Sequence, residues 1–181
     1  MRSNRRRLVL AGLATAPFAL PAPARASLGA DGAPRVLRFS HLHTGERLEV
    51  AYFDGGRYLP DALGAVNRLL RDFRSGEVGA IDPALLDLLH RLRASTGSAQ
   101  PYEIVSGFRS GATNEMLRAR SLRSGVASAS LHLTGRAIDI RVADVPLAAL
   151  RDAALGLAEG GVGYYPGSNF VHVDTGRVRR W

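Results

Sequence analysis

The segment Ser130-Leu131-His132-Leu133-Thr134-Gly135-Arg136-Ala137-Ile138-Asp139 joins a loop to a strand. Apolar and polar residues alternate in part over Gly135–Val142, which predicts a β-strand. Asp139 follows His132 by seven positions. If the loop turns at Gly135, the imidazole of His132 and the carboxylate of Asp139 can converge on one point.

A second segment, Phe170-Val171-His172-Val173-Asp174, predicts a late strand that can pair beside the first. His172 would then join His132 and Asp139, giving two imidazoles and one carboxylate. Three such ligands leave a fourth position open for water, which is the pattern of catalytic rather than structural zinc. On spacing alone, a histidine on a strand is more often a packed or hydrogen-bonding core residue, so both interpretations stay open here.

The rest of the chain predicts helices and strands of ordinary length. Asp82 and Pro83 favour a helix start, as N-cap and first helical residue. The predicted helices span 61–74, 82–93, 111–122 and 147–158, and the predicted strands span 36–39, 48–53, 103–106, 135–142, 163–165 and 170–174. Because the helices come first and the strands cluster late, we expect one α+β domain over residues 35–181. It should hold a small antiparallel sheet with the helices packed on one side.

Residues 1–26 have the pattern of a signal peptide. A basic start precedes the apolar run Leu8–Leu20, and Ala24-Arg25-Ala26 follows as a small-x-small cleavage site. The apolar run is too short to cross a hydrocarbon core of ~30 Å. Asn4-Arg5-Arg6-Arg7-Leu8-Val9 resembles a twin-arginine export signal, although the general secretory route stays open. We therefore expect a periplasmic protein without stable membrane insertion, whose residues 27–34 form a flexible lead-in.

Charge and cysteine content narrow the function classes. The formal net charge is +8, but five of the 24 basic residues lie in 1–26, which holds no acid. The remaining 19 Arg against 16 acids leave about +3, which is a poor basis for nucleic-acid binding and would suit an anionic polymer such as cell wall. The absence of cysteine excludes disulfides and a thiolate zinc site, so any metal must be held by His, Asp or Glu.

The pattern Ser-x-His-x-x-Gly-x-Ala-x-Asp is matched in full at Ser130, His132, Gly135, Ala137 and Asp139. It resembles the D-alanyl-D-alanine metallopeptidases and their relatives, a group that includes VanX, VanY, phage endolysin peptidases and the hedgehog signalling domain. The chain after the leader is more closely similar to the YcbK-like, or MepK-like, murein endopeptidases. The motifs that carry this likeness are His41–Glu46, Leu70–Asp72, Ile81–Pro83, Ser106–Ser110 with Asn114, Gly160–Pro166 and Phe170–Gly176.

This resemblance implies a zinc ion held by His132, Asp139 and His172, and an arginine at Arg109 that faces the substrate. Zinc-activated water would then hydrolyse an amide in the stem peptides or cross-links of peptidoglycan. A guanidinium at Arg109 can hold a substrate carboxylate by two hydrogen bonds or stabilise the oxyanion. Read without the family, Arg109 is about as well explained as a surface ion-pair partner.

One departure leaves the general base unassigned. Many VanX and VanY relatives carry Glu-x-x-His, whereas Asn169 stands three positions before His172, and Phe170 removes any His-x-His arrangement. Asp174 shares the strand face of His172 and is either the base or a residue that orients a ligand. A D,D-carboxypeptidase that trims terminal D-Ala, and a wall-binding module with a non-catalytic metal, therefore remain alternatives.

Two further pairs of side chains stand near these motifs. His41 and His43 would share a strand face, but histidines at strand ends more often cap hairpins than bind metal. Tyr164 and Tyr165 precede the strand of His172, and one of them could hydrogen-bond the oxyanion. We expect instead that they are half-buried core tyrosines with hydroxyls at the surface.

Overall fold

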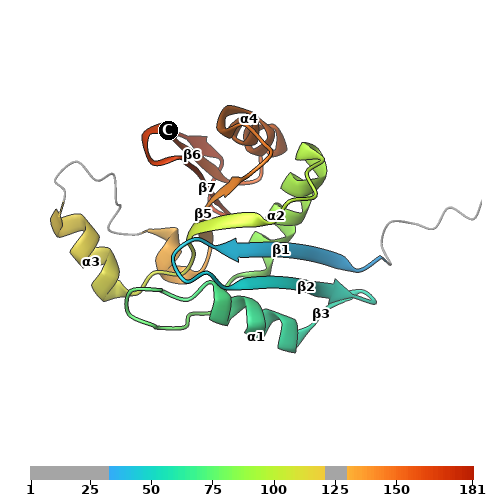
Figure 1. The fold of residues 1–181 in the computed structure, drawn as a ribbon, viewed down its shortest axis with the longest axis horizontal. Coiled ribbons are helices and arrows are strands. Elements are labelled where there is room, and N and C mark those ends of the chain that lie inside the picture. The colour runs from blue at the N-terminus through green and yellow to red at the C-terminus, as the bar shows by residue number, and fades with distance from the viewer. Residues whose placement is uncertain (1–32, 121–129) are drawn as a thin grey trace, which may run out of the picture.

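The computed structural model describes residues 33–120 and 130–181 (Figure 1). The leader predicted over residues 1–26, and all but the end of the lead-in, lie outside this part of the chain. Within it, eight strands form one sheet in the order β3-β2-β1-β4-β5-β7-β6-β8. The strands are β1 (Arg35–His41), β2 (Arg47–Asp54), β3 (Arg57–Tyr58), β4 (Tyr102–Ser106), β5 (Ala137–Val142), β6 (Gly161–Tyr165), β7 (Phe170–Asp174) and β8 (Arg179–Arg180).

Four α-helices accompany the sheet in the described ranges: α1 (Pro60–Leu69), α2 (Pro83–Thr96), α3 (Gly111–Arg120) and α4 (Leu147–Leu157). Two 3-10 turns, η1 (Leu131–Thr134) and η2 (Pro166–Ser168), precede β5 and β7. Asp82 caps α2 as expected, because its side chain accepts a hydrogen bond from the backbone N–H of Ala84 at 2.9 Å. None of the helices described in 33–120 and 130–181 is long and apolar enough to span a bilayer.

The prediction of a mixed helix-and-strand domain is confirmed, but the small antiparallel sheet is wrong. The described sheet has eight strands, and two of its pairings, β1 with β4 and β6 with β8, are parallel. Between β1 and β4 the chain passes through β2, β3, α1 and α2, so it re-enters the sheet in its original direction. The two-residue strands β3 and β8 are too short to be recognised from alternation.

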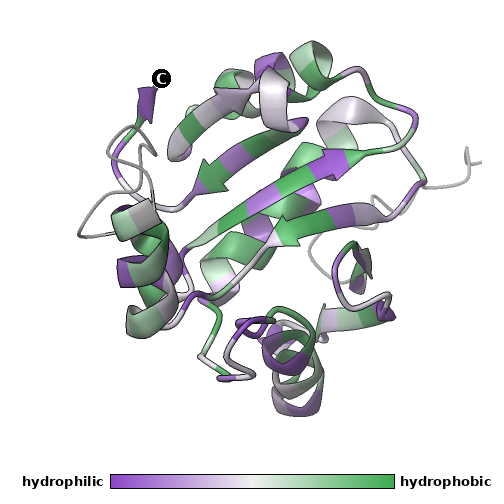
Figure 2. Ribbon diagram, turned by 60° about the vertical axis from the view of Figure 1, so that its left-hand side comes forward, coloured by the Kyte–Doolittle hydropathy of each residue, from purple (hydrophilic) through white to green (hydrophobic). Residues whose placement is uncertain are grey.

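Successive residues of a strand point to opposite faces of the sheet, so one face carries core residues and the other carries Asp139. Ile138 and Ile140 of β5 face the core beside their β7 partners Val173 and Val171. The buried residues of α1, α2 and α4 belong to the same core cluster, while Figure 1 shows α3 apart from these helices. Figure 2 shows the resulting alternation of apolar and polar residues along the strands. Asp139 lies on the opposite face from Ile138 and Ile140.

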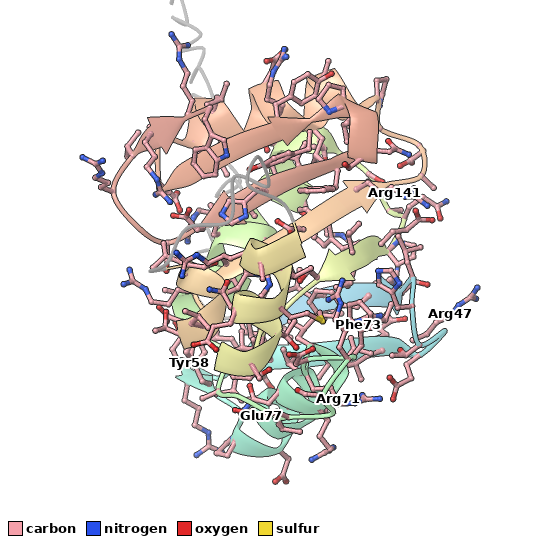
Figure 3. All side chains as sticks on the ribbon, turned by 90° about the vertical axis from the view of Figure 1, so that its left-hand side faces the viewer. Arg47, Tyr58, Arg71, Phe73, Glu77 and Arg141 are labelled. Carbon is pink, nitrogen blue, oxygen red and sulfur yellow. The ribbon has the colours of Figure 1, made fainter. Side chains whose placement is uncertain are left out.

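Helix α1 ends at Leu69, earlier than the predicted range 61–74, because Asp72 forms a turn. Its carboxylate accepts a hydrogen bond from the backbone N–H of Arg74 at 2.9 Å, and its carbonyl accepts one from Gly76 at 2.7 Å. Phe73 therefore leaves the helix and stacks on His43, with ring centroids 4.1 Å apart. Phe73 is labelled in Figure 3.

Candidate metal centre

Three separate elements bring His132, Asp139 and His172 together. His132 lies in η1, and Asp139 and His172 are direct partners in the antiparallel pairing of β5 with β7. His132 Nε2 lies 3.3 Å from both His172 Nδ1 and Asp139 Oδ1, and His172 Nδ1 lies 2.8 Å from Asp139 Oδ1. Ligands bound at ~2.0–2.2 Å to a tetrahedral ion lie about 3.3–3.6 Å apart. The two 3.3 Å distances match this spacing, and the 2.8 Å distance is that of a hydrogen bond, so a small opening of the pair His172–Asp139 would let the three buried side chains hold a small divalent cation.

The turn at Gly135 gives His132 and Asp139 this geometry. Gly135 adopts φ +64°, in the left-handed region that favours glycine, and ends η1. A Cβ at this position would collide with the carbonyl oxygen of Ala80. The Gly135 carbonyl also accepts a hydrogen bond from the N–H of Asp82 at 3.0 Å. The expected turn is confirmed, and it also joins the site to the start of α2.

The ring orientation of His132 is fixed by a backbone carbonyl. His132 Nδ1 lies 2.7 Å from the carbonyl oxygen of Gly107. A carbonyl oxygen only accepts, so Nδ1 carries a proton here. Nε2 is the nitrogen that faces Asp139 and His172, which is the orientation that a metal ligand needs.

His172 lies between two carboxylates. Nδ1 faces Asp139, and Nε2 lies 3.1 Å from Asp174 Oδ2. Burial alone would lower the pKa of His172, but hydrogen bonds to both carboxylates outweigh it and raise the pKa. A cation binds only neutral imidazole, so binding at Nδ1 would release a proton. Asp174 would then hold the remaining Nε2–H and the ring in place.

Asp174 is fully buried, and its oxygens already have several donors. Arg179 donates to both of them at 2.7 and 3.1 Å, and the backbone N–H groups of Gly161 and Gly176 donate to Oδ1 at 3.0 and 2.8 Å. Burial raises the pKa of Asp174, but these bonds and the one to His172 outweigh it and lower the pKa. Arg179 was not identified from the sequence, since nothing in its neighbourhood marks it as a partner of Asp174.

Arg109 lies on the other side of Asp139. Its Nη2 is 3.8 Å from Asp139 Oδ2, its Nη1 is 3.5 Å from Asn114 Oδ1, and its buried Nε has no hydrogen-bond partner in the described ranges. Burial lowers the pKa of this guanidinium, and Asp139 partly opposes that effect. Burial also raises the pKa of Asp139, but the two histidines outweigh it and lower the pKa. The site therefore combines an ionised carboxylate with a buried, incompletely paired cation.

A buried aspartate, Asp72, positions the loop that carries Arg109. Asp72 Oδ2 accepts hydrogen bonds from Ser110 N at 2.9 Å and Ser110 Oγ at 2.7 Å. The N–H of Arg109 donates to the carbonyl of His132 at 3.1 Å. The sequence marked Asp72 only as part of a family motif, and a link to Ser110, 38 residues away, has no local signal.

The second histidine pair has a different role. His41 Nδ1 accepts hydrogen bonds from the backbone N–H groups of His43 and Thr44 at 3.2 and 3.4 Å. His43 stacks on Phe73. The pair therefore shapes the turn after β1, in keeping with the hairpin-cap interpretation. Among the residues that the structure describes, the group of potential metal ligands is His132, Asp139 and His172.

Comparison with known proteins shows the family of the chain. Residues 30–181 match the family model described as peptidoglycan L,D-endopeptidase MepK. Peptidoglycan L,D-endopeptidase MepK of Escherichia coli (strain K12), and that of Shigella flexneri, are each 45% identical over 180 residues, which cover 99% of this chain and 97% of each relative. The probable peptidoglycan L,D-endopeptidase MepK of Haemophilus influenzae is 39% identical over 181 residues, covering 99% of this chain and 96% of the relative. The chain therefore belongs to the MepK family of peptidoglycan L,D-endopeptidases.

Proposed function

We propose that this protein is a zinc-dependent murein endopeptidase, exported to the periplasm, that hydrolyses an amide bond between an L and a D centre in peptidoglycan cross-links. The observation that carries the proposal is the convergence of His132 Nε2, His172 Nδ1 and Asp139 Oδ1, which lie 2.8–3.3 Å from one another. The names of the relatives supply the substrate class and the stereochemistry of the bond.

His132, Asp139 and His172 would hold the zinc ion. Zinc bound there would lower the pKa of a water to ~7 and polarise the amide carbonyl. The protein's own contribution is to keep the ligands oriented, through Gly107 O on one histidine and Asp174 on the other. Arg109 would bind a carboxylate of the stem peptide next to the scissile amide or stabilise the oxyanion.

Arg109→Lys is expected to lower kcat/KM by roughly 10–100-fold, the worth of one hydrogen bond to a charged group. Lysine keeps the positive charge but loses the planar pair of donors that a carboxylate needs. The measurement is steady-state hydrolysis of a cross-linked muropeptide. The matched control is Arg91→Lys on α2, which changes an ion pair between Arg91 and Glu159 at the surface. It should leave kcat/KM unchanged. If Arg109→Lys and Arg91→Lys behave alike, Arg109 does not contact the substrate.

Asp174→Asn is expected to weaken zinc affinity by about 10–100-fold, with excess zinc restoring most of the rate. The reason is that Asp174 faces His172 Nε2, away from the ligand nitrogen, and has Arg179, Gly161 and Gly176 as further partners. Zinc affinity is measured by competition with a chromogenic chelator.

If Asp174 is instead the general base, zinc stays bound and the rate falls roughly 10²–10⁴-fold. Asp144→Asn, at an exposed acid bonded to Ser98, controls for loss of charge.

Digestion of purified cross-linked muropeptides, with products identified by mass spectrometry, tests the proposed reaction. An endopeptidase converts cross-linked dimers into monomers. Release of D-alanine alone would show a D,D-carboxypeptidase instead. Binding of sacculi without any new product would show a wall-binding module.

A further inference from the structure

Trp181, the chain's single tryptophan, lies against a predicted metal ligand. Its ring centroid is 5.2 Å from that of His172. Gly163 is the β6 partner of His172, and a Cβ at Gly163 would come within 2.7 Å of the indole. The absence of a side chain at Gly163 therefore lets the ring lie over the sheet beside the site. Backbone hydrogen bonds of Trp181 to Val162 and Tyr164, at 3.2 and 3.0 Å, fix its position.

The indole in turn holds the hydroxyl of Tyr165. Trp181 Nε1–H donates to Tyr165 Oη at 2.6 Å. An indole nitrogen is a donor only, so the Tyr165 oxygen accepts here and its own O–H is left to donate elsewhere. The Tyr165 ring is also stacked on Phe170, with centroids 4.6 Å apart. The hydroxyl oxygen of Tyr165 is therefore held in position, and its O–H group remains available as a hydrogen-bond donor.

The strand alternation places this hydroxyl on the metal face. Tyr165 lies two residues from Gly163 on β6, so both share the face that carries His172. Tyr164 points the other way, where the guanidinium of Arg151 lies 4.6 Å above its ring. Tyr165 therefore lies on the same face of the sheet as His172, next to the candidate metal ligands.

We infer that Tyr165 is a catalytic residue whose O–H donates a hydrogen bond to the carbonyl oxygen of the scissile amide, and that Trp181 is the residue that positions it. This inference rests on the proposed function. When water oxygen adds to the carbonyl carbon, negative charge moves to the carbonyl oxygen, where the Tyr165 donor meets it. The C–N bond then breaks, and the leaving nitrogen takes up a proton that originates from the attacking water. Tyr165 keeps its proton throughout, so it acts as an oxyanion donor.

Tyr165→Phe is expected to lower kcat by about 10²–10³-fold, the usual cost of one oxyanion donor, with KM changed little. Tyr164→Phe removes the same atom from the opposite face and should leave kcat unchanged. An uncleavable phosphinate analogue, whose tetrahedral oxygens resemble the oxyanion, should bind Tyr165→Phe more weakly by a similar factor, while product affinity stays the same. A Tyr165→Phe kcat within threefold of the wild-type value would overturn the inference.

Displacing the indole tests the positioning role separately. Trp181→Phe keeps an aromatic ring but removes the N–H, and Gly163→Ala pushes the indole from its place. Each should lower kcat roughly fivefold, the worth of one hydrogen bond. Gly167→Ala, where a Cβ meets nothing within 4 Å, is the control. Equal kcat values in all three variants and the wild type would show that Trp181 does not position Tyr165.

Tryptophan emission gives a readout that needs neither zinc nor turnover, since Trp181 is the chain's sole tryptophan. In zinc-free protein, Tyr165→Phe should shift the emission maximum because the indole N–H loses its partner, whereas Tyr164→Phe should not. Identical spectra for all three proteins would show that the bond between Trp181 and Tyr165 does not form. A wild-type protein that cleaves no muropeptide would instead refute the proposed function, and the spectra would still report on the pair.

Discussion

His132→Ala is expected to abolish zinc binding and muropeptide hydrolysis together, with the rate lowered by more than about 10³-fold. His132 is one of the three proposed ligands and is buried in η1, where the Gly107 carbonyl orients its Nε2 toward Asp139 and His172. Without the ion, the pKa of the water would rise far above ~7, and the nucleophile would be lost at neutral pH. Zinc content by mass spectrometry and initial rates, measured on the same preparation, give both quantities.

His43→Ala is the matched control for this prediction, because His43 is exposed and stacks on Phe73 rather than facing the site. It should retain one zinc per chain and nearly the full rate. The combined His132→Ala/His172→Ala variant leaves Asp139 alone among the three predicted ligands. Full zinc occupancy in that variant would show that the metal binds elsewhere.

Gly135→Ala is expected to reduce the free energy of unfolding by roughly 2–5 kcal/mol. Placing alanine at φ +64° costs about 1–2 kcal/mol. The collision of its Cβ with the Ala80 carbonyl adds about 1–3 kcal/mol, since backbone on both sides must move. Because Gly135 separates His132 from the strand of Asp139, zinc affinity should fall as well. Urea denaturation gives the stability, and chelator competition gives the affinity.

Gly97→Ala separates the two contributions to this loss. Gly97 ends α2 with φ +67°, but a Cβ there meets nothing within 4 Å. It should therefore show only the conformational cost of about 1–2 kcal/mol and leave zinc affinity unchanged. Equal losses of stability in Gly97→Ala and Gly135→Ala would mean that the contact with Ala80 relaxes freely.

Local patterns in the sequence were sufficient to predict most helices and strands and to single out the three side chains that the fold brings together. The predicted helix at 82–93 corresponds to α2, because an N-cap aspartate and proline mark its start. The proposed ligands His132 and Asp139 lie within one short motif, and their convergence depends on a single turn. His172 becomes their neighbour through the pairing of β5 with β7, two segments that the sequence predicts as strands.

Features that depend on contacts between distant parts of the chain could not be predicted from the sequence. The parallel pairing of β1 with β4 and the short strands β3 and β8 follow from tertiary packing rather than from local alternation. Asp72 reaches Ser110 across 38 residues, and the indole of Trp181 reaches Tyr165 across 16. In each case no local pattern marks the pair, and only the folded chain shows the partner.

The most direct test of the central claim is a zinc titration of chelator-treated protein, followed by hydrolysis of cross-linked muropeptides. The convergence of His132, Asp139 and His172 predicts no hydrolysis without metal, and a rate that rises with zinc and saturates at one equivalent per chain. Undiminished hydrolysis by protein shown to contain no metal would contradict it.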